Sequence, residues 1–172
     1  MLLLNLSDQP QSLNNLQNDL KEPFEMFGFK NLKVAAHKNY PIASNWKLAV
    51  ENYQECYHCA TAHPDYAKMH TLTLDDNKRD RVQGHMIKKM EHCGLKDIEI
   101  DCIDIKAPKG EQGYGYSRTA LFEGYKTGSK DGEPIAPLLG NFTGYDGGAS
   151  DFALGPFTFL LAYSDHVVAY VF

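Results

Sequence analysis

The sequence lacks a basic cluster, a long apolar run and a dense set of cysteines. Its 172 residues have a net charge of −5 and no run of Lys or Arg, which argues against a nucleic-acid partner. The apolar start, Met1 to Leu4, is too short to span a membrane and lacks the basic region of a secretory signal. Four cysteines without such a signal predict free thiols and a cytoplasmic protein.

What the sequence does contain is typical of one soluble globular domain. Hydrophobic residues make up 43% of the chain and charged residues 23%, and the length is sufficient for a real core. Helical spacing of apolar residues predicts a helix over residues 11–27, kinked or ended at Pro23. A second helix is expected from Trp46 to about Ala62, capped by Ser44-Asn45 and stopped by Pro64.

From residue 98 the pattern changes to the alternation of strands separated by Gly-rich turns. The apolar stretch 157–172 predicts a hairpin that turns at 164–166. Together with the helices this indicates an α+β fold. Shorter strand-like pieces are residues 2–6, 32–37 and 40–43.

Between these parts, residues 65–95 are polar, and residues 75–79 are expected to form a solvated loop. Three histidines in this region are predicted to be surface residues, namely His70, His85 and His92. His37 is expected to have a structural role, and Trp46 to be a core anchor.

The densest group of ligand-type side chains is Glu55-x2-His58-x4-His63, with Cys56 and Cys59 beside it. Glu55 and His58 share one face of an ideal helix, whereas His58 and His63 lie about 140° apart. The two imidazoles therefore converge only if the helix bulges or breaks before Pro64. Two histidines and one distant carboxylate would form the ligand set that leaves positions open on Fe(II), with Glu55 accepting a hydrogen bond from a histidine ring.

Other interpretations of the same residues stay open. Cys56-x2-Cys59 could be a thiol redox pair or half of a zinc site, and the histidines could be ordinary core residues. Asp146 and Asp151 are candidates for a third metal ligand, although their spacing does not single them out.

The stretch 45–64 resembles the catalytic-domain motif of the large (alpha) subunits of Rieske non-haem iron oxygenases, the ring-hydroxylating type. The matching residues are Asn45-Trp46-Lys47, Glu51-Asn52-Tyr53, Glu55-Cys56-Tyr57-His58 and His63-Pro64. The resemblance implies that His58 and His63 bind a mononuclear Fe(II). Glu55 would link this site to the [2Fe–2S] Rieske cluster of a neighbouring subunit.

The resemblance further implies a helix-grip (START/Bet v 1-like) domain over most of residues 30–172, in which a curved antiparallel sheet packs on helices. The enzyme would be a mono- or dioxygenase that hydroxylates or demethylates a small organic substrate with dioxygen and electrons from a reductase or ferredoxin. It would be a homo-oligomer. Glu55, where many members have aspartate, favours amine substrates over arenes.

The family's Cys-x-His…Cys-x2-His cluster motif is absent, and its third iron ligand is expected beyond Phe172. Residues 1–172 are therefore interpreted as a partial catalytic domain, truncated at its C-terminus, with residues 1–30 as the remnant that joins a Rieske domain. We expect this chain alone to be inactive and to bind iron weakly. The competing hypothesis is a helix-grip carrier of hydrophobic ligands without catalytic activity.

Overall fold

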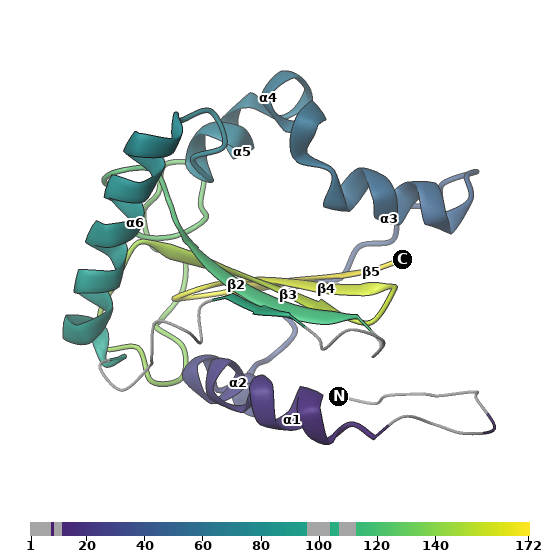
Figure 1. The fold of residues 1–172 in the computed structure, drawn as a ribbon, viewed down its shortest axis with the longest axis horizontal. Coiled ribbons are helices and arrows are strands. Elements are labelled where there is room, and N and C mark those ends of the chain that lie inside the picture. Colours follow the sequence, from purple (N-terminus) through teal and green to yellow (C-terminus); the bar gives the residue numbers. More distant parts are fainter. Residues whose placement is uncertain (1–7, 9–11, 96–103, 107–112) are drawn as a thin grey trace.

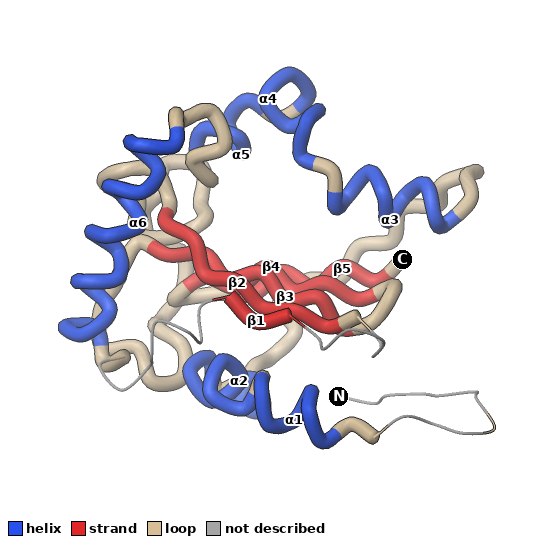
Figure 2. Tube along the Cα trace, in the orientation of Figure 1, coloured by secondary structure: helices blue, strands red, loops and turns tan. Residues whose placement is uncertain are grey.

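Five antiparallel strands form one sheet in sequence order, β1-β2-β3-β4-β5 (Figures 1 and 2). The structure is a computed structural model that describes residues 8, 12–95, 104–106 and 113–172. The strands are β1 (Asp104–Lys106), β2 (Tyr114–Ala120), β3 (Gly148–Leu154), β4 (Thr158–Tyr163) and β5 (Val167–Val171). The predicted C-terminal hairpin is confirmed, with β4 and β5 joined by a turn at 164–166.

Helices lie on both faces of this sheet (Figure 1). The short helices α1 (Asn14–Asp19) and α2 (Lys21–Phe27) cover one face and lead into a 3-10 turn, Phe29–Asn31. Across the other face run α3 (Trp46–Gln54), a 3-10 turn at Cys56–His58, α4 (Cys59–Ala62) and α5 (Pro64–Met69). The long helix α6 (Asp76–Met90) flanks the sheet and ends in a 3-10 turn, Glu91–Cys93. The predicted α+β class is confirmed.

Side chains alternate between the two faces because successive strand residues point to opposite sides. On β3, Phe152 points to the α2 face, where its ring lies 5.4 Å from the rings of Phe24 and Phe29. Ala149 and Asp151 point to the opposite side, which we call the α3–α5 face. There Tyr66 of α5 packs against a buried cluster that includes Ala149.

The predicted N-terminal helical stretch is confirmed from Asn14 to Phe27, but this segment forms two helices. Leu20 lies between them with ψ of 3° and is fully buried against the sheet. Pro23 is the third residue of α2, where its missing N–H would have no partner within the helix in any case, so the proline does not end the helix.

Two sequence predictions outside the sheet are wrong. Residues 32–37 and 40–43 form no strand, and Val34, Tyr40 and Ile42 are exposed, because none of the strands that the structure describes pairs with them. The expected loop at 75–79 is the start of α6. The Asp75 carboxylate accepts a hydrogen bond from the Lys78 backbone N–H at 3.0 Å and so caps the helix.

Several single-residue predictions also require correction. His70 is 6% exposed, so it is a buried residue, whereas His85 and His92 are at the surface as predicted. His37 and Trp46 are exposed and do not belong to the core. The expected strand at 2–6 and the alternating Ile98, Ile100 and Ile103 lie outside the described residues. None of the helices that the structure describes is long and apolar enough to cross a membrane.

Candidate metal centre

The helix that contains the ligand-type residues is broken, as their spacing required. Asn45 caps α3 by accepting a hydrogen bond from the backbone N–H of Lys47 at 3.0 Å. Glu55 then leaves the helical conformation, with φ −98° and ψ 101°, and a 3-10 turn follows. The predicted continuous helix over 46–62 is therefore wrong, but the predicted distortion is confirmed.

A second break brings the two histidines together. His63 has φ −135° and ψ 62°, outside the helical region, because the ring of Pro64 disfavours a helical conformation at the preceding residue. Pro64 ends α4 and is also the first residue of α5, where its fixed φ suits a helix start. The ring centroids of His58 and His63 lie 5.6 Å apart with planes at 78°.

This arrangement fits a metal ion held by two imidazoles. The Nδ1 atom of His58 is buried and has no hydrogen-bond partner, which is costly for a polar nitrogen unless a ligand completes it. The side chain of His63 is exposed, and that of His58, which lies beside it, is half-buried. The ring separation lets one nitrogen from each ring approach a shared ion at about 2 Å. Within the described part of the chain no group of three ligand-type residues is assembled, so a third ligand would come from elsewhere.

Glu55 lies at the break with its side chain exposed. Its backbone N–H donates a hydrogen bond to the carbonyl oxygen of Glu51 at 2.9 Å, which completes the last turn of α3. In the described residues no hydrogen bond joins the Glu55 carboxylate to His58 or His63. The carboxylate is therefore accessible to a group outside this chain.

The neighbouring thiols do not have the properties of a redox pair. Cys56, Cys59 and Cys93 are free cysteines, as predicted. Burial, and then a hydrogen bond with Cys59, raises the pKa of the Cys56 thiol to about 11. A reactive thiol requires a lowered pKa, since the thiolate is the nucleophile. The raised pKa of Cys56 thus disfavours the thiol-redox interpretation.

Asp146 is not available as a metal ligand. Its carboxylate accepts hydrogen bonds from Nη2 of Arg118 at 2.6 Å and from Nε at 3.0 Å, and both side chains are fully buried. Arg118 points to the α2 face, where the rings of Phe27 and Phe142 contact its guanidinium group. Asp146 therefore has a structural role, and its candidacy as a ligand is withdrawn.

Asp151, in contrast, lies on the same side of the sheet as the histidine segment. It is half-buried on the α3–α5 face, on which Tyr53 of α3 contacts Phe159 and Tyr66 of α5 contacts the cluster that includes Ala149. Burial raises the pKa of its carboxyl group to about 6. Asp151 points to the face of β3 opposite to that of Ser150 and Phe152, whereas Asp146 precedes β3 and is paired with Arg118.

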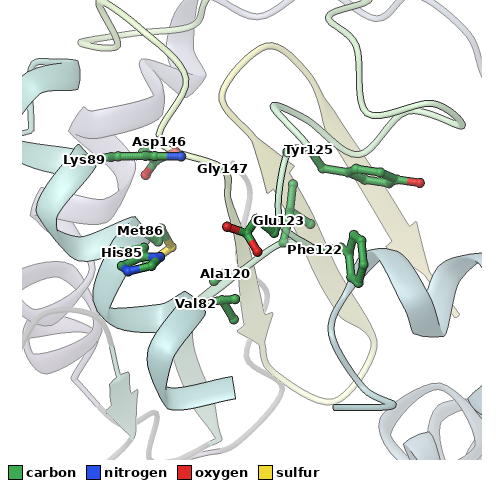
Figure 3. A pocket seen from close by; sticks show the side chains of 12 residues that line it. Val82, His85, Met86, Lys89, Ala120, Phe122, Glu123, Tyr125, Asp146 and Gly147 are labelled. Atoms are coloured by element: carbon green, nitrogen blue, oxygen red, sulfur yellow. The ribbon is translucent and has the colours of Figure 1, made fainter. Parts of the chain in front are cut away.

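The histidine pair is not part of the small cavity between α6 and the end of β2 (Figure 3). This cavity of about 50 Å³ is lined by residues that include His85, Met86, Glu123 and Gly147. Its volume suits one or two water molecules, whereas cavities for small organic ligands have several hundred Å³. It is not a candidate substrate site.

Comparisons with known proteins agree with this geometry. Residues 29–172 match the family described as "Ring hydroxylating alpha subunit (catalytic domain)". The glycine betaine monooxygenase oxygenase subunits of Chromohalobacter salexigens and Pseudomonas aeruginosa PAO1 are 28% and 26% identical to this chain over 98% of its length. The carnitine monooxygenase oxygenase subunit of Acinetobacter baumannii is 53% identical over 38 residues, 22% of the chain and 10% of that protein.

The chain spans only 38% and 39% of the two glycine betaine relatives. The family match, however, covers most of its residues and includes the broken helix with Glu55, His58 and His63. The resemblance to Rieske oxygenase alpha subunits is thereby confirmed. This chain belongs to the family of ring-hydroxylating alpha subunits, and its residues 29–172 match their catalytic domain.

Proposed function

We propose that this chain supplies the mononuclear iron site of a Rieske-type monooxygenase. The observation that supports this most directly is the pairing of His58 and His63, with ring centroids 5.6 Å apart and a buried Nδ1 of His58 that has no partner. Two neutral imidazoles are typical ligands of the two-histidine, one-carboxylate Fe(II) sites that use dioxygen. The carboxylate ligand of this site would come from outside the described residues.

In this proposal the two histidines hold the metal from one side and leave its other side open toward the sheet. Iron bound there would supply dioxygen activation with electrons that a reductase or ferredoxin delivers through a [2Fe–2S] centre. Exposed Glu55 would accept a hydrogen bond from a histidine of that centre in a neighbouring subunit. The protein would therefore work as a homo-oligomer, because one subunit's iron site would depend on the cluster of another.

The substrate we propose is a quaternary amine. Glycine betaine and carnitine, which the names of the relatives contain, both carry a trimethylammonium group and a carboxylate. Glutamate rather than aspartate at position 55 fits the same preference. Hydroxylation of an N-methyl group with one oxygen atom of dioxygen, the other atom being reduced to water by two electrons from the reductase, would demethylate such a compound, because the C–N bond then breaks and the methyl carbon leaves as formaldehyde.

Three further points belong to this proposal. The sheet and its covering helices would form a helix-grip domain. Residues 1–30 would connect it to a Rieske domain. Free thiols at Cys56, Cys59 and Cys93 fit a reducing cytoplasm.

The test is titration with Co(II), which reports on imidazole ligation through its visible spectrum. The protein, the single variants His58→Ala and His63→Ala, and the control His85→Ala at an exposed site on α6 are compared. We expect both ligand variants to lose affinity at least about tenfold, and the control to bind as the wild type does. Equal binding by the ligand variants would contradict the proposal and would favour a metal-free carrier of hydrophobic ligands. Loss of binding in Cys56→Ser but not in His63→Ala would instead indicate a thiolate site.

A further inference from the structure

Asp151, on the α3–α5 face of the sheet, is a carboxylate that has no partner among the residues the structure describes. It is half-buried, and within the described residues no hydrogen bond or ion pair involves its side chain. A half-buried carboxylate is costly to keep without a counter-charge or a hydrogen-bond donor. The nearest buried cation, Arg118, points to the opposite face and is neutralised by Asp146. Asp151 therefore has an unused negative charge.

Its position on the sheet places this charge between aromatic side chains. Asp151 pairs with Leu161 of β4, and the residues two positions to either side of Leu161, Phe159 and Tyr163, point to the same face. Such diagonal neighbours lie about 7 Å away, within reach of large side chains. One aromatic residue thus lies on each side of the carboxylate along the neighbouring strand.

The helices add two more rings above these strand residues. From α3, the ring of Tyr53 lies 4.7 Å from that of Phe159 and 5.0 Å from that of Tyr170. From α5, Tyr66 belongs to the same apolar cluster as Tyr163. Both helices flank the segment of His58 and His63, and this segment lies with them over the same face of the sheet (Figure 1).

The electrostatics of these tyrosines agree with the geometry. Burial, and next the charge of Asp151, raises the pKa of Tyr53 and of Tyr66. The same carboxylate contributes to the raised pKa of Tyr163 and Tyr170, after burial as the first cause. All four rings are thus within the electrostatic reach of one carboxylate. A bound cation would be attracted both by this charge and by the faces of the rings.

We propose that Asp151 and the surrounding tyrosines bind the quaternary ammonium group of the substrate and position it beside the metal centre. This assignment rests on the proposed function. A trimethylammonium group has no N–H, so it cannot be recognised by hydrogen bonds from the cation. A carboxylate and aromatic faces are the side chains that attract it. Asp151 would be a specificity-determining residue, distinct from the metal ligands.

The experiment compares two ligands of the same shape. Glycine betaine and 3,3-dimethylbutanoate differ only in the central atom, which is a charged nitrogen in one and a neutral carbon in the other. Binding of each to the full chain is measured by calorimetry for wild type, Asp151→Asn, and the control Asp80→Asn at an exposed site on α6. Co(II) binding and circular dichroism are recorded for every variant.

We expect wild type to bind glycine betaine more tightly than its neutral analogue. Asp151→Asn should lose this preference, with affinity for glycine betaine reduced about tenfold or more and Co(II) binding unchanged. Absence of any preference in wild type, or a preference that survives in Asp151→Asn, would overturn the inference and leave the metal site standing. Loss of Co(II) binding in Asp151→Asn would also overturn it, since Asp151 would then be a metal ligand. Co(II) binding by His58→Ala and His63→Ala is a separate measurement, and its outcome tests only the proposed function.

Discussion

The Nε2 atom of His70 lies 2.9 Å from the hydroxyl oxygen of Tyr163, which connects α5 to strand β4. The ring of Tyr66, one turn earlier on α5, stacks on His70 at 4.2 Å. Because α5 begins directly after His63, this buried contact holds the histidine segment above the sheet. This hydrogen bond joins two residues that are 93 positions apart in the chain.

The substitution Tyr163→Phe removes this hydrogen bond and leaves a buried nitrogen of His70 without a partner. We expect the free energy of unfolding to fall by about 1–3 kcal/mol, because an unsatisfied buried polar group retains its desolvation cost. Urea unfolding measures the change. The matched control is Tyr40→Phe, whose side chain is 74% exposed and which should be neutral. Equal stability of both variants would show that the contact contributes nothing.

The stability of the protein should depend on pH through His70. Burial lowers its pKa from 6.5 to about 4. Between these values the unfolded chain binds a proton that the folded chain does not, so stability falls as the pH drops below 6.5, by up to about 1.4 kcal/mol per pH unit. Between pH 6.5 and 4, the free energy of unfolding of wild type should therefore fall relative to that of His70→Gln as the pH decreases. Parallel stability curves for the two proteins would contradict a buried neutral histidine.

Replacement of Pro64 should weaken metal binding more than it lowers the free energy of unfolding. With Pro64→Ala, His63 is free to adopt a helical conformation, so α4 and α5 can merge and the two imidazoles can diverge. We expect a weaker affinity for Co(II) with a change in unfolding free energy below about 1 kcal/mol. Pro156→Ala, at an exposed turn before β4, serves as the control. A variant that keeps wild-type affinity would show that Pro64 does not set the ligand geometry.

The buried ion pair on the α2 face should dominate the charge contributions to stability. Asp146→Asn leaves the guanidinium of Arg118 uncompensated in the core, and we expect a loss of about 3–5 kcal/mol. Glu133→Gln breaks the exposed pair with Lys126, joined at 2.7 Å, and should cost less than about 1 kcal/mol. Chemical denaturation of both variants makes the comparison. Similar losses would mean that burial does not distinguish the two pairs.

Two glycine substitutions should have effects of opposite sign. A Cβ atom at Gly128 would lie within 2.4 Å of three ring atoms of Tyr163, so Gly128→Ala must displace the ring that bonds to His70 and should be destabilising. A Cβ at Gly84, inside α6, has open space around it. Gly84→Ala should therefore stabilise the helix by about 0.5–1 kcal/mol. Thermal unfolding measures the stability of both variants. A Gly128→Ala variant as stable as wild type would show that the loop can move away from the ring.

The sequence by itself was sufficient for the local features of this protein. The spacing of Glu55, His58 and His63 together with Pro64 predicted a distorted helix, because the residue before a proline avoids the helical conformation whatever surrounds it. The apolar stretch 157–172, broken at 164–166, predicted the hairpin of β4 and β5, because a short polar break between two apolar runs is typical of a turn. The flanking motif identified the family. These features depend on residues close together in the chain.

Only the tertiary structure decided which polar residues are buried and which face each one occupies. Asp146 and Asp151 were equivalent as candidates in the sequence, yet one neutralises Arg118 and the other lies among tyrosines on the histidine side. His70 was expected at the surface because its neighbours in the chain are polar. Its partner Tyr163 belongs to a distant strand, and no local pattern records such a pairing. Strand register and helix packing assign these side chains, because they determine which distant residues remove each one from water.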